Sequence, residues 1–395
     1  MTVHSLRKPA GLLALLASLF GSTTMAQNAP DAPAASVAEK LINVRMTTNM
    51  GEMVIELNNE KAPISVANFL KYADRGFYNN TLFHRVMPNF MIQGGGYGLG
   101  LIEKRDTDAP IQNEWGNGLK NDRGAIAMAR KPDPHSATAQ FFINTVDNPR
   151  LDASTPQEAQ SLGGAGYAVF GKVVAGIGVV DAIKGVPTRN EPSIGSQPAP
   201  IEPVVIEKVE RIAAADVDGA KAAAEASVEK ANAEAKRRNE AKAGIENAAK
   251  QRFIDQGKAL GTPEEQFTKA MDWLKAKGVD VSKGSKSDSG LWSVEVQPGD
   301  GASPVPTDTI RAHYTGWLVN GNKFDSSVDK GVPLEYPLNR LAQGWIEGLG
   351  AMKVGAKRWL VLPAALGYGE SGYPPVIPPS ATLIFEIELL EVVGK

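Results

Sequence analysis

One segment, residues 220–253, constrains the fold of this 395-residue chain more than any other. It consists almost throughout of alanine, lysine, glutamate and arginine, which are strong helix formers, and it contains no proline and one glycine, Gly244. Two acid-to-base pairs lie in the favourable i, i+4 order: Glu234 with Arg238, and Glu246 with Lys250. A helix of this length would extend about 50 Å. Its apolar stripe is too sparse for a coiled coil, so a solvated spacer is expected, with a self-associating helix as the alternative.

The composition argues against several classes of function. With 43% hydrophobic residues over 395 positions, two or three domains with their own cores are expected. The formal net charge is −2 and no basic stripe alternates with aromatic residues, which argues against a nucleic-acid partner. The chain has no cysteine, and no two of its four histidines lie at metal-ligand spacing. No disulfide, no metal site and no cofactor are therefore expected.

The N-terminal residues have the form of a secretion signal. Two basic residues precede an apolar run at 10–20, and the small residues Thr24 and Ala26 occupy the positions that a signal peptidase reads. The run is too short to cross a bilayer, which takes about 20 residues. We therefore expect a signal peptide at 1–26, a flexible leader at 27–40, and a mature protein in the periplasm without a membrane anchor.

Residues 41–212 have the pattern of a small β-rich domain. Short alternating runs are separated by glycine-rich turns, and only two stretches have helical spacing. The run FHRVMPNFMIQGG at 83–95 predicts two strands joined by a Pro-Asn turn, which would present Arg85 and Gln93 from a rigid sheet. From the pattern alone, an arginine that merely pairs with a carboxylate is an equally good interpretation.

The same run resembles the signature of the cyclophilin family of peptidyl-prolyl isomerases, above all its bacterial exported members. Three further motifs follow in the family's order: AMA at 127–129, QFFIN at 140–144 and YAVFGKV at 167–173. The resemblance implies a cyclophilin-like closed β-barrel with two helices over 41–213. It assigns catalysis to Arg85, Gln93 and Phe90. It also implies a proline groove lined by Met91, Ala129, Gln140, Phe142, Leu151 and Tyr167.

A second helix, near 263–277, has clearer limits. Thr262 is a typical N-cap with a capping-box glutamate at Glu265, and Gly278 supplies the stop. Large apolar side chains repeat on one face, at Phe267, Met271 and Leu274. That face must bury against the final domain or against another protomer, and the sequence leaves both open. The helical spacer as a whole is expected at 214–284.

After a Ser-, Lys- and Gly-rich linker at 282–290, the chain returns to a β pattern. Asn320-Gly321 is a strong hairpin signal because both positions accept a positive φ. Residues 344–349 have the spacing of one short helix. Aromatic residues are concentrated in this part of the chain, and at strand spacing they are more typical of a core than of a pocket.

The motifs HYTG, FDSS, GWIEGL, YG and IPP occur in this order before a closing TLIFEIELLEV. They resemble the FKBP family, and they imply an FKBP-like antiparallel sheet wrapped on a short helix over 285–395. The resemblance assigns catalysis to Asp325 and Tyr368. It implies a proline pocket formed by Tyr314, Phe324, Leu341, Trp345, Ile377 and Phe385. Ala342 and Tyr373 stand where many members have isoleucine and histidine.

The sequence as a whole predicts a multidomain, mainly β peptidyl-prolyl cis–trans isomerase. Its two isomerase domains would assist the folding of exported proteins, and its partners would be unfolded or partly folded chains with X-Pro bonds. Rotation about such a bond crosses a barrier of about 18–20 kcal/mol. The reaction moves no proton, so apolar proline binding and a donor at the proline amide nitrogen suffice. The alternative is a periplasmic chaperone, or holdase, that forms a homodimer through the helical spacer and grips clients, with isomerisation secondary.

Weak inhibition of the first domain by cyclosporin is expected. Arg150 stands where eukaryotic cyclophilins carry a tryptophan that contacts this inhibitor, and Tyr167 replaces their histidine. An inhibition titration of the isolated domain checks this, and nanomolar inhibition would refute it.

Overall fold

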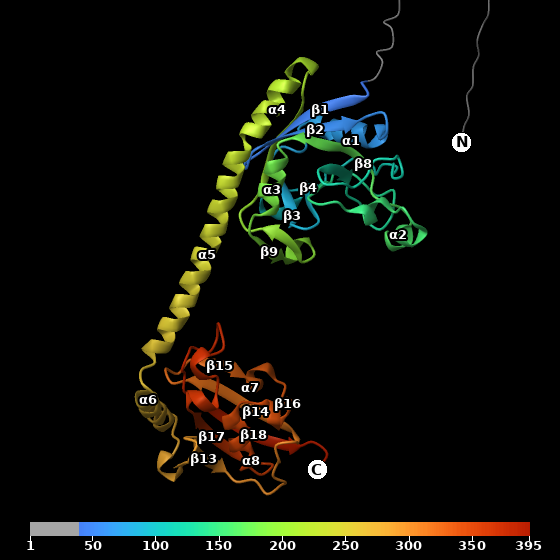
Figure 1. Cartoon of the computed structure of the whole chain (residues 1–395). Coiled ribbons are helices and arrows are strands. Elements are labelled where there is room, and N and C mark those ends of the chain that lie inside the picture. Colours follow the sequence, from blue (N-terminus) through green and yellow to red (C-terminus); the bar gives the residue numbers. More distant parts are fainter. Residues whose placement is uncertain (1–38) are drawn as a thin grey trace, which may run out of the picture.

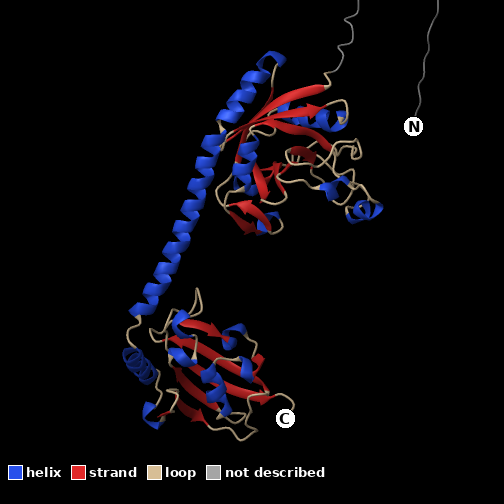
Figure 2. Ribbon diagram, viewed as in Figure 1, coloured by secondary structure: helices blue, strands red, loops and turns tan. Residues whose placement is uncertain are grey.

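The computed structural model describes residues 39–395. The signal peptide predicted at 1–26 lies outside the described residues, and so does the leader predicted at 27–40 except for its last two positions. The described chain forms two bodies, mainly of β structure, joined by one long helix (Figures 1 and 2). The predicted multidomain, mainly β fold class is confirmed. Among residues 39–395, every helix is too short or too polar to traverse a bilayer.

The first body is a closed antiparallel barrel. Its strands run in the order β3-β11-β1-β2-β8-β6-β7-β4, and the pairing of β4 with β3 closes it. These strands are β1 (Leu41–Thr48), β2 (Glu52–Asn58), β3 (Thr81–Met87), β4 (Met91–Gly98), β6 (Ala125–Met128), β7 (Phe141–Asn144), β8 (Val169–Ala175) and β11 (Val205–Arg211). The short β5 (Ile102–Glu103) extends β4. Two helices, α1 (Pro63–Asp74) and α3 (Ile177–Lys184), pack on the barrel, as the resemblance implied.

Aromatic side chains fill the barrel. Phe69 from α1 is fully buried, and its ring centroid lies 5.0 Å from that of Tyr78 and 5.4 Å from that of Phe170. The Tyr78 hydroxyl donates to the carbonyl oxygen of Ala139 at 3.0 Å, so its burial is compensated by a hydrogen bond. Because the interior is packed, a binding groove on this body must lie on the outside of the barrel.

Two features of the first body escaped the sequence analysis. The helix α2 (Pro156–Ser161) begins with a capping box formed by Thr155 and Glu158. The strands β9 (Thr188–Glu191) and β10 (Gln197–Pro200) form a separate two-stranded hairpin. Both segments are short and polar, so neither has the hydrophobic periodicity on which the predictions relied.

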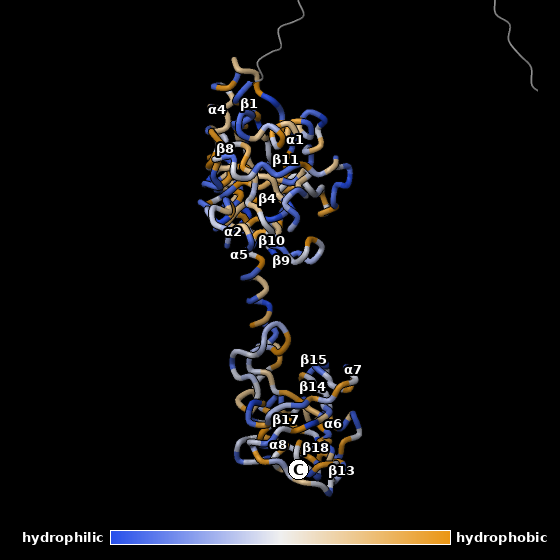
Figure 3. The backbone as a smooth tube through the Cα atoms, turned by 90° about the vertical axis from the view of Figure 1, so that its right-hand side faces the viewer, coloured by the Kyte–Doolittle hydropathy of each residue, from blue (hydrophilic) through white to orange (hydrophobic). Residues whose placement is uncertain are grey.

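The spacer contains α4 (Val217–Ala226) and α5 (Val228–Ala259), and one face of its first half is buried, whereas a solvated helix was expected. Four alanines are buried against the first body: Ala220, Ala224, Ala231 and Ala235. Their small side chains allow close approach to α3, where a Cβ added at Gly178 would lie only 2.4 Å from Val228. From 243 to 252 every residue is exposed. Figure 3 shows α5 as the only connection visible between the two bodies.

Arg238 lies at the interface between α5 and the first body. Its side chain is 5% exposed, its Nε donates to Glu234 at 2.8 Å, and its Nη1 donates to the carbonyl oxygen of Glu202 at 2.9 Å. The first predicted i, i+4 pair therefore forms, but in a buried setting. The second predicted pair is wrong, because Glu246 pairs with Lys242 instead, at 3.7 Å.

The end of the spacer packs on the second body. Gly257 of α5 lies against Pro379, which leaves no room for a side chain. The helix α6 (Pro263–Ala276) turns its apolar face to the same body, and the ring centroid of Trp273 lies 5.2 Å from that of Trp317. The sequence left two partners open for this face, the final domain or another protomer. In the structure the face packs against the final domain.

The second body is an antiparallel sheet wrapped on a short helix, as the FKBP resemblance implied. Its strands run in the order β12-β13-β17-β18-β14-β15, and β16 also pairs with β14. They are β12 (Ser285–Lys286), β13 (Trp292–Gln297), β14 (Thr309–Leu318), β15 (Lys323–Ser326), β16 (Leu334–Pro337), β17 (Lys357–Leu362) and β18 (Leu383–Val392). The helix α8 (Gln343–Gly350) packs through Trp345 and Leu349, and α7 (Ser327–Lys330) is a single turn beside β14.

One local expectation for the second body is wrong, whereas the hairpin predicted at Asn320-Gly321 is confirmed by the pairing of β14 with β15. The expected Ser/Lys/Gly linker is fixed, because β12 pairs with β13 and Gly284 lies against the ring of Trp292, 2.1 Å from where a Cβ would be. At the hairpin turn only Gly321 has a positive φ, +86°. Asn320 instead accepts a hydrogen bond from the amide of Asn322 at 3.0 Å.

Gln266→Ala is expected to destabilise the second body by about 2 kcal/mol. Gln266 is buried; it accepts from the amide of Thr382 at 2.7 Å and donates to the carbonyl oxygen of Ser380 at 3.1 Å. Its loss leaves the buried amide of Thr382 without an acceptor. Urea unfolding followed by tryptophan fluorescence measures the change. Gln251→Ala, on the exposed part of α5, is the control and should change stability by less than about 0.5 kcal/mol. An unchanged transition for Gln266→Ala would contradict the expectation.

Candidate active sites

Three polar side chains form a connected line on the outside of the barrel. Arg85 on β3 lies directly opposite Gln93 on β4, and its Nη1 donates to Gln93 Oε1 at 3.2 Å. Gln93 Nε2 in turn donates to Gln140 Oε1 at 2.9 Å. Within residues 39–395, Arg85 forms no ion pair with a carboxylate, so the alternative interpretation of this arginine does not hold.

An apolar cluster distinct from the barrel core lies beside this line. Met91, Phe142 and Leu151 are buried in it, and Phe90, Ala129 and Tyr167 pack against them half-exposed. Strand geometry explains the arrangement, because successive side chains of β4 point to opposite faces, so that Ile92 enters the core. Phe142 pairs with Gln93 across β7 and β4. The structure thus brings together all nine residues that the sequence assigned to this groove.

The charge of Arg85 is held at the edge of the apolar cluster. Burial lowers the pKa of its guanidinium, and the nearby Tyr167 partly opposes this. An arginine remains charged at neutral pH even so. Its Nε is buried and makes no hydrogen bond within the described part of the chain. The site therefore offers a permanent cation, although the buried Nε is not a donor that a ligand could reach.

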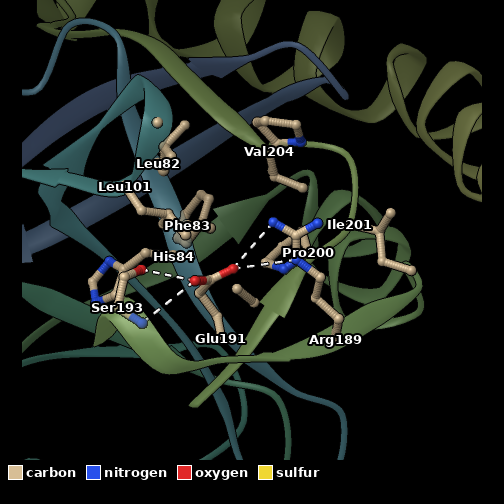
Figure 4. Close-up of a pocket in the computed structure, with 13 residues that line it drawn as sticks. Leu82, Phe83, His84, Leu101, Arg189, Glu191, Ser193, Pro200, Ile201 and Val204 are labelled. Carbon is tan, nitrogen blue, oxygen red and sulfur yellow. Dashed lines mark hydrogen bonds and ion pairs between the residues drawn. The ribbon is translucent and has the colours of Figure 1, made fainter. Parts of the chain in front are cut away.

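His84, the neighbour of Arg85, lies outside the groove. It is 4% exposed, its ring centroid lies 4.5 Å from that of Tyr97, and burial lowers its pKa to about 4. It lines a cavity of about 190 Å³ together with Glu191 on the β9–β10 hairpin (Figure 4). None of the nine groove residues lines this cavity. His84 is a neutral structural residue, in keeping with a reaction that needs no general base.

In the second body, Asp325 is held by three donors. Its Oδ2 accepts from the Tyr314 hydroxyl at 2.5 Å, and its Oδ1 accepts from Lys330 Nζ at 2.5 Å and from the amide of Ser326 at 2.9 Å. Burial alone would raise the pKa of Asp325, but the hydrogen bonds from Lys330 and Tyr314 outweigh it and lower the pKa. Burial and the adjacent carboxylate raise the pKa of Tyr314. Asp325 is therefore an ionised orienting group for Tyr314.

Aromatic rings form a box beside this pair. Trp345 lies at the first turn of α8, and its ring centroid lies 5.1 Å from Tyr314 and 5.2 Å from Phe385, both nearly perpendicular. Phe324 meets Phe385 at 5.6 Å in the same way. Edge-to-face packing of this kind fixes the rings. Ile377, which is buried, and the half-buried Leu341 belong to the same cluster.

Tyr368 lies at the rim of the box. It is 43% exposed, and its ring centroid is 5.5 Å from that of Tyr373, which is 58% exposed. Its hydroxyl makes no hydrogen bond to the rest of the described chain, and burial raises its pKa. Ala342 is the N-cap residue of α8 and packs against the cluster. Six predicted pocket residues therefore belong to the core cluster of the second body, and Tyr368 lies near enough to Asp325 for that carboxylate to contribute to its raised pKa.

The structure adds two residues that the sequence analysis missed. Arg130 lies over the ring of Tyr167, 4.5 Å from its centroid, and donates to the carbonyl of Leu162 at 2.8 Å, which holds Tyr167 in the groove. Lys330 fixes Asp325 in the second site. Only their closeness in sequence to groove residues could have suggested either one. No group of three or more His, Cys, Asp or Glu side chains suited to a metal ion occurs between residues 39 and 395.

Comparisons with known proteins match each body separately. The family model described as cyclophilin type peptidyl-prolyl cis-trans isomerase/CLD matches residues 43–211, and that described as FKBP-type peptidyl-prolyl cis-trans isomerase matches residues 301–390. Peptidyl-prolyl cis-trans isomerase B of Escherichia coli is 55% identical over 166 residues, which are 42% of this chain and 97% of that protein. The FK506-binding protein of Neisseria meningitidis serogroup B is 51% identical over 105 residues, 26% of this chain and 96% of that protein. The FKBP-type 22 kDa peptidyl-prolyl cis-trans isomerase of Escherichia coli is 49% identical over 108 residues, 27% of this chain and 52% of that protein.

Gly96→Ala is expected to lower the activity of the first site without unfolding the barrel. A Cβ at Gly96 would lie 2.4 Å from the amide end of Gln140, which must move and release Gln93. The backbone can stay in place, because only the end of a flexible side chain is displaced. We expect turnover of a proline-containing peptide to fall about tenfold, from the loss of one positioned hydrogen bond, while thermal unfolding followed by circular dichroism stays unchanged.

The control for this change is Gly98→Ala, because a Cβ at Gly98 meets nothing closer than 3.9 Å. Both are measured in a Trp345→Leu background, which removes the floor of the second pocket. Equal activity of the Gly96 and Gly98 variants would show that the position of Gln140 does not matter.

Proposed function

Because the chain belongs to the cyclophilin family through residues 43–211 and to the FKBP family through residues 301–390, it is a peptidyl-prolyl cis–trans isomerase, and we propose that both bodies catalyse this reaction on exported proteins as they fold. The observation that carries the proposal is the charged Arg85, which has no carboxylate partner in the described chain and lies beside an apolar cluster. A second support is the closed aromatic box over Trp345.

In the first site, the apolar cluster binds the proline ring and Arg85 stabilises the twisted amide. As the X-Pro bond rotates, resonance is lost and the proline nitrogen becomes a hydrogen-bond acceptor, which a positioned cation favours over the planar ground state. Arg85 has donors free for this purpose, since only one contact to Gln93 is made. Gln93 uses one amide hydrogen on Gln140 and keeps the other for the substrate carbonyl.

The second site works with less charge. Lys330 and Tyr314 both bond to Asp325, so the charge of Lys330 is used within the wall of the site. The aromatic walls hold the proline away from water, and removal of water weakens the resonance form that opposes rotation. Tyr368 at the rim has a free hydroxyl and binds the carbonyl before the proline. This site therefore depends more on desolvation than the first.

The proposed setting is the periplasm, and it rests on the N-terminal sequence. Basic residues, an apolar run and the small residues Thr24 and Ala26 have the order of a cleavable export signal. Exported chains fold without the cytoplasmic machinery, and isomerisation of their X-Pro bonds takes tens of seconds or more unless catalysed. An isomerase with two sites would act on slow steps of this kind.

A chaperone that grips unfolded clients remains the second candidate. The apolar face of α6 no longer supports this candidate, because the second body covers that face and it is not free for another protomer. The exposed middle of α5 still favours it, since Ile245 is 68% exposed there and offers a contact for a second copy. In that arrangement the two grooves of each copy would hold one client chain.

The decisive comparison is between Arg85→Ala and Trp345→Leu in the whole chain. Each variant should silence its own site, with about a hundredfold loss for Arg85→Ala in that site, and the double variant should retain almost no prolyl isomerisation. The measurement is a protease-free assay with a proline-containing peptide, with circular dichroism to show that each variant folds. Separate bodies serve as a second check, and the C-terminal piece must begin before Gly257, because α6 is part of its core.

The two-site proposal fails if either body is folded but inactive. In that case the inactive groove is better explained as a client-binding surface, and the chaperone candidate gains. Residual activity in the double variant equal to that of the parent would refute the assignment of both sites.

A further inference from the structure

A second cavity adjoins the aromatic pocket of the C-terminal body. It has a volume of about 720 Å³, and Phe324, which belongs to the proline pocket, also forms part of its wall. One side of the cavity comes from the end of α5, through Leu260, and from the middle of α6, through Lys269. The other side comes from the β14–β15 hairpin and from Val376 in the loop before β18. Figure 1 shows the lower end of α5 beside this part of the second body.

Both walls of the cavity are fixed by packing. Gly257 lies against Pro379, and Leu260 is 6% exposed within the core of the second body. Gln266 of α6 is hydrogen-bonded to the backbone at Ser380 and Thr382. The end of the spacer helix is therefore a fixed part of the cavity wall. A preformed cavity of this size lies within the range of about 300–1,000 Å³ that is typical of ligand sites.

The lining combines apolar and basic side chains. Phe324, Val376 and two prolines are among the apolar residues, and three amide side chains are interspersed: Gln256, Asn320 and Asn322. Two lysines and no carboxylate line the cavity. Lys323 is paired with Asp329, so its charge is largely compensated. Lys269 donates to the carbonyl of Leu260 at 2.8 Å and has no carboxylate partner in the described chain.

We propose that this cavity is a subsite for the stretch of client chain next to the proline, and that it favours an acidic residue there. The argument rests on continuity with the proline pocket through Phe324 and on the charge of Lys269. An extended client chain that leaves the proline pocket would place its side chains against the apolar residues of the cavity. Its backbone groups would lie near the amide side chains of the lining. A carboxylate in that stretch would reach Lys269. The inference depends on the proposed function of the second site.

The test uses the whole chain with Arg85→Ala, so that the second site alone is measured. Three peptides share one Ala-Leu-Pro-Phe core and carry glutamate, glutamine or lysine residues on both sides of it. The ratio of kcat/KM for the glutamate peptide to that for the lysine peptide should be about five, as expected for one partly exposed ion pair. The difference should lie in KM, since the contact is made equally in the ground and transition states.

Variants of Lys269 identify the source of the preference. Lys269→Gln should bring the ratio to about one, Lys269→Glu should invert it, and Lys269→Arg should keep it. The control is Lys353→Gln, which removes an exposed lysine that does not line the cavity. A ratio of one in the parent, or a preference that Lys269→Gln leaves unchanged, would overturn the subsite. Turnover of the core tetrapeptide alone distinguishes failure of the subsite from failure of the proline pocket. Loss of this turnover would count against the proline pocket itself.

Discussion

The two faces of strand β4 are the constraint on which the first site depends. Ile92 must enter the barrel, so its neighbours Met91 and Gln93 must point outward. Closure of the barrel through the pairing of β3 with β4 then fixes Arg85 opposite Gln93. A slip by one residue would bury the polar pair and expose the core. The positions of Arg85 and Gln93 are therefore maintained by the same packing that stabilises the barrel, whereas Tyr167 is held by Arg130.

The helix between the bodies is held at both ends by small residues rather than by an apolar stripe. Alanines of α4 and α5 allow the first half to approach the barrel, and Gly257 allows the other end to approach Pro379. Arg238 adds hydrogen bonds to the backbone of the first body. The two sites are thus carried by one continuous helical element with an exposed middle, which limits how far they can separate while both ends stay packed.

Much of the fold was predictable because its signals are local. Strand alternation, glycine stops and the Thr262 capping box gave the main elements, and motif resemblance gave the groove residues. The packing of α5 was not predictable, since alanine is the best helix former and is equally suited to a solvated helix. Arg238 likewise has the pattern of an exposed ion pair, although it is 5% exposed. Arg130 and Lys330 were missed for a related reason, because their roles depend on contacts that only the folded chain creates.

If both sites act as proposed, they accelerate the same reaction by different physical means. At Arg85 a permanent charge lies at the border of an apolar cluster, and its electrostatic benefit grows as water is excluded. At Trp345 the charges of Asp325 and Lys330 cancel within the wall, so the pocket presents little net charge to the proline. Under the proposed mechanism, a client X-Pro bond that is already poorly solvated would gain little from the second site but would still gain from the first. Two sites that differ in this way would widen the range of X-Pro bonds that one chain can accelerate.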